Sequence, residues 1–286
     1  MMTSMTNSSL FKGPAIGLGT WQMGERASDA KSEVAAIAHA LDQGMRLIDT
    51  AEMYADGRSE SLVGQALKIF GAGRRSELTL VTKVLPHHAS AAGTLRACED
   101  SLRRLGTDYI DIYLLHWEGS HPYEQTLEAF ASLRERGLVR RWGVSNFDLK
   151  PLARWLATEE AMGLEQGCAT NQVFYSLMAR GPEFDLLPAM AQIDMPLMAY
   201  TPLGSGELPR HPGLLRIAKS MGVSAAQLAL AWTIRSGKVV AIPKSSSTAR
   251  IDENLAAASL MLPEPVLNEI DVLSPPPRRK QSLAMV

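Results

Sequence analysis

The stretch MRLIDTAEMYADGRSESLVGQALKIF, residues 45–70, contains one complete strand–loop–helix unit. Its first six residues, Met45 to Thr50, include the apolar Met45, Leu47 and Ile48 and are predicted as a short strand. Apolar residues then recur at helical spacing in the second half, at Val63, Ala66, Leu67 and Phe70. The segment therefore predicts a strand followed by an amphipathic helix, with a polar loop between them.

The same unit repeats along nearly the whole chain. Eight β-like runs are predicted as strands, at Ile16–Thr20, Met45–Thr50, Leu78–Leu85, Tyr109–His116, Arg140–Ser145, Ala169–Val173, Pro196–Tyr200 and Lys238–Ile242. Helices are predicted between them, one over Val34–Leu41, one burying Leu95, Cys98, Leu102 and Leu105, and others near residues 123–136, 149–157, 183–192, 224–236 and 249–258. Eight consecutive βα units predict a closed parallel (β/α)8 TIM barrel, with an open doubly wound sheet as the alternative.

Length and composition fit one globular α/β domain. The chain has 286 residues, of which 46% are hydrophobic and 21% charged, and its formal net charge is −1. Such values exclude a mainly disordered or coiled-coil chain. The balanced charge offers no broad basic surface, so we expect neither nucleic acid nor a membrane as a partner. The sequence does not determine the oligomeric state.

Cysteine content and the N-terminal residues predict the cellular compartment. Cys98 and Cys168 cannot form a disulfide framework, and they lack the spacing of a redox or zinc motif. The N-terminal residues show no charged segment followed by an apolar one, so we expect no secretory signal. We therefore predict a cytoplasmic protein.

The C-terminal residues are expected to leave the barrel. We predict a single domain over residues 1–286, with a core from about residue 14 to 274 and an extended tail over 275–286. Three consecutive prolines, Pro275 to Pro277, cannot continue a helix. The tail either projects into solvent or folds over the mouth of the barrel.

Titratable residues stand on three consecutive predicted strands, where a (β/α)8 barrel carries its reacting groups. They are Asp49 with Tyr54 in the following loop, then Lys83, then His116. A buried lysine is costly unless it is paired, so we expect Lys83 to contact Asp49. An ammonium near a phenol favours the phenolate, so Lys83 is expected to lower the pKa of Tyr54 from about 10. The pattern predicts a site that polarises a carbonyl oxygen; a purely structural ion pair is the alternative.

Motifs for other chemistries are incomplete. The segment GLGTWQMG, residues 17–24, has Gln22 where a dinucleotide-binding loop requires its third glycine. The segment GVSNF has Phe147 where a nucleophile elbow requires glycine. The adjacent His87 and His88 are expected at a pocket rim or in solvent, because neighbouring residues rarely chelate one metal. We therefore predict no metal site.

Several segments together resemble the aldo-keto reductase family, from Gly17 to Asn254 and beyond. In chain order they are LIDTAEMYADGRSESLVGQAL, VTKV, YLLHW, RRWGVSNF, TNQVFYSL, AYTPLG and IPKSSSTARIDEN. The DTAEMYADG run resembles bacterial members that act as methylglyoxal reductases. The family resemblance covers nearly the whole chain and implies the fold predicted above.

The resemblance also implies roles for individual residues. It implies a catalytic tetrad of Asp49, Tyr54, Lys83 and His116, in which Tyr54 is the general acid. It implies a site for NADPH formed by Gly19, Thr20, Asp49, Ser145, Asn146, Gln172, Tyr200, Leu203, Ser205, Lys244, Ser245, Arg250, Glu253 and Asn254. Within this set, three polar side chains would bind the carboxamide and an aromatic ring would stack on the nicotinamide, namely Ser145, Asn146, Gln172 and Tyr200. Residues that directly follow strand ends would form a substrate pocket, or else pack the barrel: Trp21, Met53 and Trp117, with Tyr54 and His116.

The segment from Lys244 to Ser247, with Arg250 six residues after Lys244, has the composition of an anion site. Two cations and several hydroxyl groups precede a predicted helix whose first N–H groups are unpaired. Such a site favours the 2′-phosphate of NADPH over the neutral hydroxyl of NADH. A capped helix with cations on its surface is the alternative.

These observations predict an NADPH-dependent reductase of aldehydes or ketones, with 2-oxoaldehydes such as methylglyoxal among its substrates. Two other functions stay open. A protein of this fold can bind the nicotinamide cofactor as a regulatory subunit, and a barrel lyase can use the Lys83 amine to form a Schiff base.

Overall fold

The computed structural model describes residues 10–164 and 167–285. It contains an eight-stranded parallel sheet in which each strand pairs with the next in sequence order. The strands are β1 (Leu18–Gly19), β2 (Leu47–Asp49), β3 (Thr79–Val84), β4 (Ile110–Leu115), β5 (Val139–Ser145), β6 (Asn171–Phe174), β7 (Leu197–Tyr200) and β8 (Val239–Ala241). All eight predicted strands are present, although most are shorter than predicted.

Backbone contacts between the last strand and the residues before β1 close the sheet. The Gly17 amide donates to the Ala241 carbonyl oxygen over 2.8 Å, and the Ala241 amide donates to the Ala15 carbonyl oxygen over 2.9 Å. Ile16 also forms a parallel bridge with Ala241. The predicted (β/α)8 barrel is therefore confirmed, and the open doubly wound alternative is wrong.

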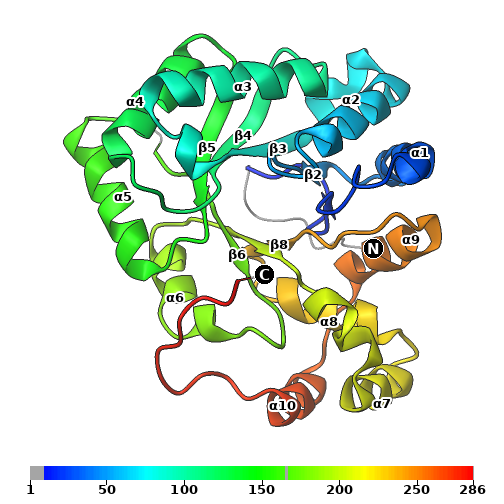
Figure 1. Cartoon of the computed structure of the whole chain (residues 1–286). Helices are drawn as coiled ribbons and strands as arrows, with labels where there is room; N and C mark the ends of the chain where they lie inside the picture. Colours follow the sequence, from blue (N-terminus) through cyan, green and yellow to red (C-terminus); the bar gives the residue numbers. More distant parts are fainter. Residues whose placement is uncertain (1–9, 165–166, 286) are drawn as a thin grey trace.

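Helices surround the sheet (Figure 1). They are α1 (Ala30–Asp42), α2 (Arg58–Phe70), α3 (Ala91–Leu105), α4 (Tyr123–Glu135), α5 (Leu149–Ala161), α6 (Leu186–Gln192), α7 (Pro212–Ser220), α8 (Ala225–Ile234), α9 (Thr248–Ala256) and α10 (Glu264–Leu273). Short 3-10 helices are η1 (Ala27–Asp29), η2 (Ala72–Glu77), η3 (Pro86–His88), η4 (Gly181–Glu183), η5 (Gly204–Gly206), η6 (Leu208–Arg210) and η7 (Ala257–Ser259).

The sequence-based interpretation missed α7 and α10. Helix α7 has Pro212 at its first position, where proline is favoured, and it buries Leu214, Ile217 and Ala218 at helical spacing. A (β/α)8 barrel has one helix after each strand, and the predicted helix after β7 corresponds to α8. The signal for α7 was present in the sequence, but the repeat pattern gave no reason to expect a second helix there.

Cys98 lies in the hydrophobic core on α3, with none of its surface exposed. Burial raises the pKa of the Cys98 thiol to about 12. The thiol is therefore protonated and unreactive at neutral pH. Its burial agrees with the prediction from the helical pattern. Among the described residues, no helix has the length and apolar character needed to cross a membrane.

The C-terminal tail folds back over the mouth of the barrel, which resolves the two alternatives left by the sequence. Residues 275–285 form neither helix nor strand, as predicted for the described part of this segment. They run from α10 back toward the centre of the barrel (Figure 1), and Met285 lines the cavity at its mouth.

Candidate active site

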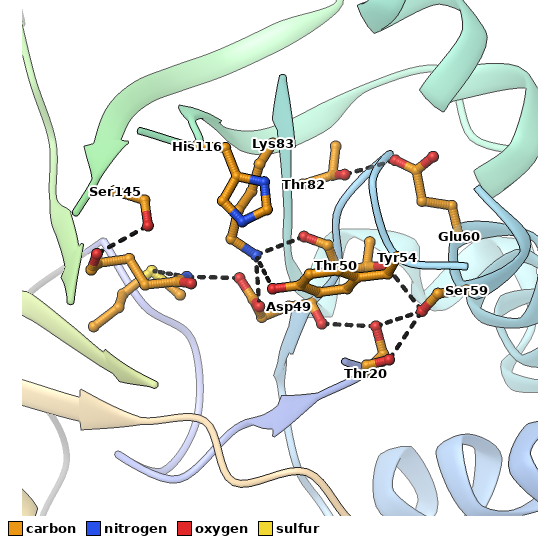
Figure 2. Close-up of polar contacts among 12 residues, drawn as sticks. Thr20, Asp49, Thr50, Tyr54, Ser59, Glu60, Thr82, Lys83, His116 and Ser145 are labelled. Atoms are coloured by element: carbon orange, nitrogen blue, oxygen red, sulfur yellow. Dashed lines mark hydrogen bonds and ion pairs between the residues drawn. The ribbon is translucent and has the colours of Figure 1, made fainter. Parts of the chain in front are cut away.

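Lys83 lies at the centre of the candidate site (Figure 2). Its Nζ donates hydrogen bonds to Asp49 Oδ2 over 2.8 Å, to the Thr50 carbonyl oxygen over 2.8 Å and to the Tyr54 hydroxyl over 3.2 Å. Its side chain is 0% exposed and the side chain of Asp49 is 2% exposed. The expected contact between Lys83 and Asp49 is therefore present, and the same ammonium also reaches Tyr54.

The contacts around Lys83 determine which groups in the cluster carry a charge. Burial opposes the ammonium of Lys83, but Asp49 and Tyr54 outweigh it and raise the Lys83 pKa. Burial raises the pKa of Asp49, against the opposing effects of Lys83 and the Gln172 amide. The raised pKa of Asp49 favours its neutral form, whereas the raised pKa of Lys83 favours its charged form. We assign both groups as charged, because Asp49 accepts short hydrogen bonds from the ammonium and from Gln172 Nε2, the latter over 2.7 Å.

The expectation that the pKa of Tyr54 falls is wrong for the protein alone. Burial raises the Tyr54 pKa, and Asp49 raises it further, whereas Lys83 acts in the expected downward direction but is outweighed by burial. The tyrosine consequently holds its proton at neutral pH. This is the state that a proton donor requires.

His116 follows the end of β4 and stands beside Tyr54. Their ring centroids are 5.9 Å apart with an interplanar angle of 72°. Burial, assisted by the nearby Lys83 charge, holds the pKa of His116 well below its ordinary value. The ring is therefore neutral at physiological pH and carries a single N–H donor. Among the described residues, its Nδ1 is a buried nitrogen without a hydrogen-bond partner.

The side chain of Thr20 lies behind the tetrad, and the predicted contact of this residue with the cofactor stays a prediction. Its side chain is fully buried, and its hydroxyl donates to the Asp49 carbonyl oxygen over 3.0 Å and accepts from Ser59 Oγ over 2.8 Å (Figure 2). Ser59 Oγ also lies 3.3 Å from Thr50 Oγ1. Thr20 thus joins β1, β2 and α2 behind the tetrad and does not line the cavity. The sequence places Thr20 at a strand end but does not reveal which way its side chain points.

Strained backbone is concentrated at this end of the barrel. Seven non-glycine residues in the described part of the chain have a positive φ. Six of them lie in loops that follow strands at the mouth, namely Gln22, Ala55, Asp56, Asn146, Thr201 and Ser205. Such residues cost free energy and persist where the surrounding structure fixes them, most often at functional sites.

A large cavity opens at the mouth, with a volume of about 1530 Å³. It exceeds the ~300–1,000 Å³ of common ligand pockets, so it has room for a dinucleotide and a small substrate together. Every sequence-predicted site residue lines it except Thr20 and Lys83, which lie beneath its surface. In particular the predicted substrate-pocket residues Trp21, Met53 and Trp117 line it, together with Met285 of the tail. His87 and His88 do not line it, and His88 Nδ1 instead lies 3.1 Å from Glu52 Oε1.

Two amide side chains line the cavity: Asn146 directly follows β5, and Gln172 lies within β6. Asn146 Nδ2 donates to the His116 carbonyl oxygen over 3.0 Å, and Asn146 Oδ1 accepts from the Tyr200 hydroxyl over 2.8 Å. Gln172 Nε2 is bound to Asp49, as noted above, and Ser145 Oγ donates to the Gln172 carbonyl oxygen over 2.9 Å. These amides are fixed by protein contacts. Their side-chain oxygens retain lone pairs that can accept hydrogen bonds from a carboxamide.

The other end of the cavity is cationic. Lys244 and Arg250 line it beside Ser245, whose side chain is largely buried, and α9 begins next to them at Thr248. No ion pair forms at either cation among the described residues. Glu253 and Asn254 lie one turn further along α9 and also line the cavity. Two cations, a hydroxyl group and a helix N-terminus form a donor set suited to a phosphate group.

Sequence reasoning missed one part of the cavity wall. It is formed by η6, α7 and the loop before α8, and its cavity-lining members include Arg210, Leu215, Lys219, Val223 and Ser224. The signal in the sequence was weak. Ser224 and Gln227 form a capping box at the start of α8, which marks a helix end but no ligand.

Comparison with known proteins agrees with this geometry. The model of the aldo/keto reductase family matches residues 15–275. The methylglyoxal reductase YeaE of Escherichia coli K12 is 46% identical over 281 residues, which cover 96% of this chain and 95% of the relative. A 9,11-endoperoxide prostaglandin H2 reductase of Trypanosoma cruzi is 34% identical, with coverage of 91% and 88%.

Solved structures show the same similarity. An aldo/keto reductase from Klebsiella pneumoniae, crystallised with NADP and acetate and also with NADPH, superposes with a TM-score of 0.90 at 47% identity. The match covers 96% of this chain and 95% of that one. This protein therefore belongs to the aldo/keto reductase family.

Proposed function

We propose that this protein reduces aldehydes or ketones to alcohols with NADPH, and that Tyr54 donates the proton. The observation that carries the proposal is the contact of 3.2 Å between the Tyr54 hydroxyl and a buried, ion-paired ammonium at the base of the cavity. When bound, NADPH supplies the hydride that the carbonyl carbon receives. The chain's own residues supply the proton and hold the charge.

Each member of the tetrad has a separate task. Tyr54 holds its proton at neutral pH and gives it to the oxygen of the carbonyl group as negative charge develops there. Lys83 then stabilises the negative charge left on the phenol oxygen, which lowers the cost of the transfer. Asp49 keeps Lys83 charged and oriented. The neutral His116 ring orients the carbonyl oxygen through its one N–H group.

The donor set at the other end of the cavity supports NADPH as the cofactor. Lys244, Ser245 and Arg250 would hold the 2′-phosphate, and Glu253 and Asn254 would contact the adenine. Ser145, Asn146 and Gln172 would hold the carboxamide, and Tyr200 would stack on the nicotinamide. The relative from Klebsiella pneumoniae, which binds NADP and NADPH in its solved structures, supports this assignment.

We propose small aldehydes, including 2-oxoaldehydes such as methylglyoxal, as the substrate class. Trp21 and Met53 are 39% and 38% exposed at the mouth, where they offer apolar surface to a bound molecule. The similarity to the Escherichia coli methylglyoxal reductase supports this class.

The experiment mixes purified protein with NADPH and a panel of aldehydes that includes methylglyoxal, and follows the loss of NADPH absorbance. We expect substrate-dependent oxidation of NADPH. Tight NADPH binding without oxidation by any aldehyde would favour the regulatory-subunit alternative instead.

A Schiff-base role for Lys83 requires a neutral, accessible amine. The Lys83 ammonium is fully buried and donates three hydrogen bonds, and its pKa is raised. We therefore expect borohydride treatment in the presence of substrate to trap no adduct on Lys83, and a trapped adduct would support the lyase alternative.

A further inference from the structure

The C-terminal tail reaches the cavity at its end. Met285 lines the cavity, although 60% of its surface is exposed. Leu283, two residues earlier, packs against the hydrophobic core of the barrel. The tail is therefore part of the wall around the candidate site, and whatever fixes the tail also fixes that part of the wall.

One side chain of the tail bridges two loops of the barrel mouth. Lys280 Nζ forms ion pairs with Asp148 and with Asp185, the latter over 2.8 Å. Asp148 follows β5 and caps α5 by accepting a hydrogen bond from the Leu149 amide over 2.7 Å. Asp185 immediately precedes α6. A single ammonium thus ties the tail to the βα loops after β5 and β6.

The surroundings of Lys280 show how its two ion pairs hold the tail in place. The tail backbone runs close over η4, because a Cβ atom at Gly181 would lie 3.4 Å from Gln281 Cβ. Asp148 and Asp185 share the same cation, so without Lys280 the two carboxylates would face each other unneutralised. A single exposed ion pair contributes little to stability, but here the cation also relieves this repulsion.

We infer that Lys280 is a positioning residue that holds the tail across the barrel mouth, so that Met285 forms part of the cavity wall. This inference rests on the proposed function where it concerns substrate binding. With the tail in place, a small carbonyl compound is held in a narrower pocket. With the tail released, that wall is lost while the tetrad and the NADPH-binding cations keep their places.

The test compares the wild type with four variants: Lys280→Gln, Lys280→Arg, Asp185→Asn and Arg279→Gln. Arg279→Gln is the matched control, because it removes one positive charge from the next residue, which forms no ion pair among the described residues. Asp185 is chosen over Asp148 because its side chain does not cap a helix. Limited digestion with chymotrypsin, followed by intact mass, measures cleavage in the tail after Leu283, a residue that all four variants keep and that packs against the core when the tail is in place. Steady-state kinetics with methylglyoxal measure KM and kcat.

We expect Lys280→Gln and Asp185→Asn to be cleaved in the tail about two- to fivefold faster than the wild type, the range that an ion pair of up to about 1 kcal/mol produces. We expect KM for methylglyoxal to rise in the same two variants, while kcat and the Kd for NADPH stay unchanged. Lys280→Arg, which keeps the cation, and Arg279→Gln should both resemble the wild type.

Two results would overturn the inference: equal cleavage of Lys280→Gln and the wild type, or faster cleavage without any change in KM. Digestion does not depend on activity. A wild-type protein that reduces no carbonyl compound would therefore contradict the proposed function, while the cleavage rates would still decide whether Lys280 holds the tail.

Discussion

At the scale of single residues, the candidate site depends on where protons are held. The Tyr54 hydroxyl keeps its proton because burial outweighs the nearby ammonium, and His116 is neutral because it is buried beside that same ammonium. The group that gives up a proton and the group that orients the carbonyl oxygen are therefore both uncharged before the reaction. Lys83 and Asp49 carry the charges.

These pKa directions predict the pH dependence of carbonyl reduction. The proton donor is active while protonated, and its pKa is raised above about 10, so kcat should vary little between about pH 7 and 9 and fall above about pH 10. His116 has its pKa well below about 6.5, so it should add no titration near neutrality. A loss of kcat centred between about pH 7 and 8 would contradict the assignment of Tyr54.

At the scale of elements, the loop between β2 and α2 holds Tyr54 through an unusual backbone. Ala55, Asp56 and Gly57 follow it with φ values of 50°, 53° and 79°. Only glycine adopts this region without a steric cost, so two residues of this turn are strained. The α2 helix begins directly after the turn, and its residue Glu60 accepts a hydrogen bond from Arg104 over 2.6 Å.

This turn predicts opposite effects of two exchanges on stability. Ala55→Gly should raise the free energy of unfolding by about 1 kcal/mol, because it relieves left-handed strain. Gly57→Ala should lower it by about 1–3 kcal/mol, because the new Cβ would lie 2.6 Å from Arg104 Cδ. Thermal or denaturant unfolding measures both changes.

Gly137→Ala is the control for Gly57→Ala. Its φ of 73° is similar, but nothing lies within 4 Å of the added Cβ. Gly137→Ala should lower the free energy of unfolding only by the cost of the left-handed backbone. An equal decrease in Gly57→Ala and Gly137→Ala would show that the contact with Arg104 is unimportant.

Lys244 in the β8–α9 loop and Arg250 in the first turn of α9 predict a preference for NADPH over NADH. Removing both Lys244 and Arg250 by exchange to alanine should weaken NADPH binding by about a hundredfold or more, because two charge-assisted hydrogen bonds to a phosphate are lost. NADH binding should change little, since NADH lacks that phosphate. Fluorescence titration with both cofactors measures the difference.

A suitable control exchanges Lys31 and Arg96 for alanine, because both are exposed and neither lines the cavity. Equal losses for NADPH and NADH in the Lys244 and Arg250 double variant would contradict the 2′-phosphate assignment.

At the scale of the whole molecule, the sequence predicts the barrel because apolar strand runs and helical spacing repeat along the chain. The tetrad was predictable because strand ends meet at one mouth. The second helix after β7 has a local signal, but the repeat pattern gave no reason to expect it. The direction of the Thr20 side chain and the balance between burial and charge at Tyr54 depend on tertiary contacts. No local pattern in the sequence encodes them.

The same limit applies to the tail. Pro275 to Pro277 predict an extended segment, but only the fold brings Asp148 and Asp185 within reach of Lys280. The part of the cavity wall formed by α7 was missed for the same reason. Residues far apart in sequence meet there, and no motif marks their contact.

The central claim is that Tyr54 donates the proton in an NADPH-dependent reduction. Its most direct test is a comparison of kcat for methylglyoxal between the wild type and Tyr54→Phe, together with the Kd for NADPH of each protein. The exchange removes one hydroxyl group, so kcat should fall by about a hundredfold or more while the Kd for NADPH stays the same. A Tyr54→Phe variant that reduces methylglyoxal at the wild-type rate would contradict the claim.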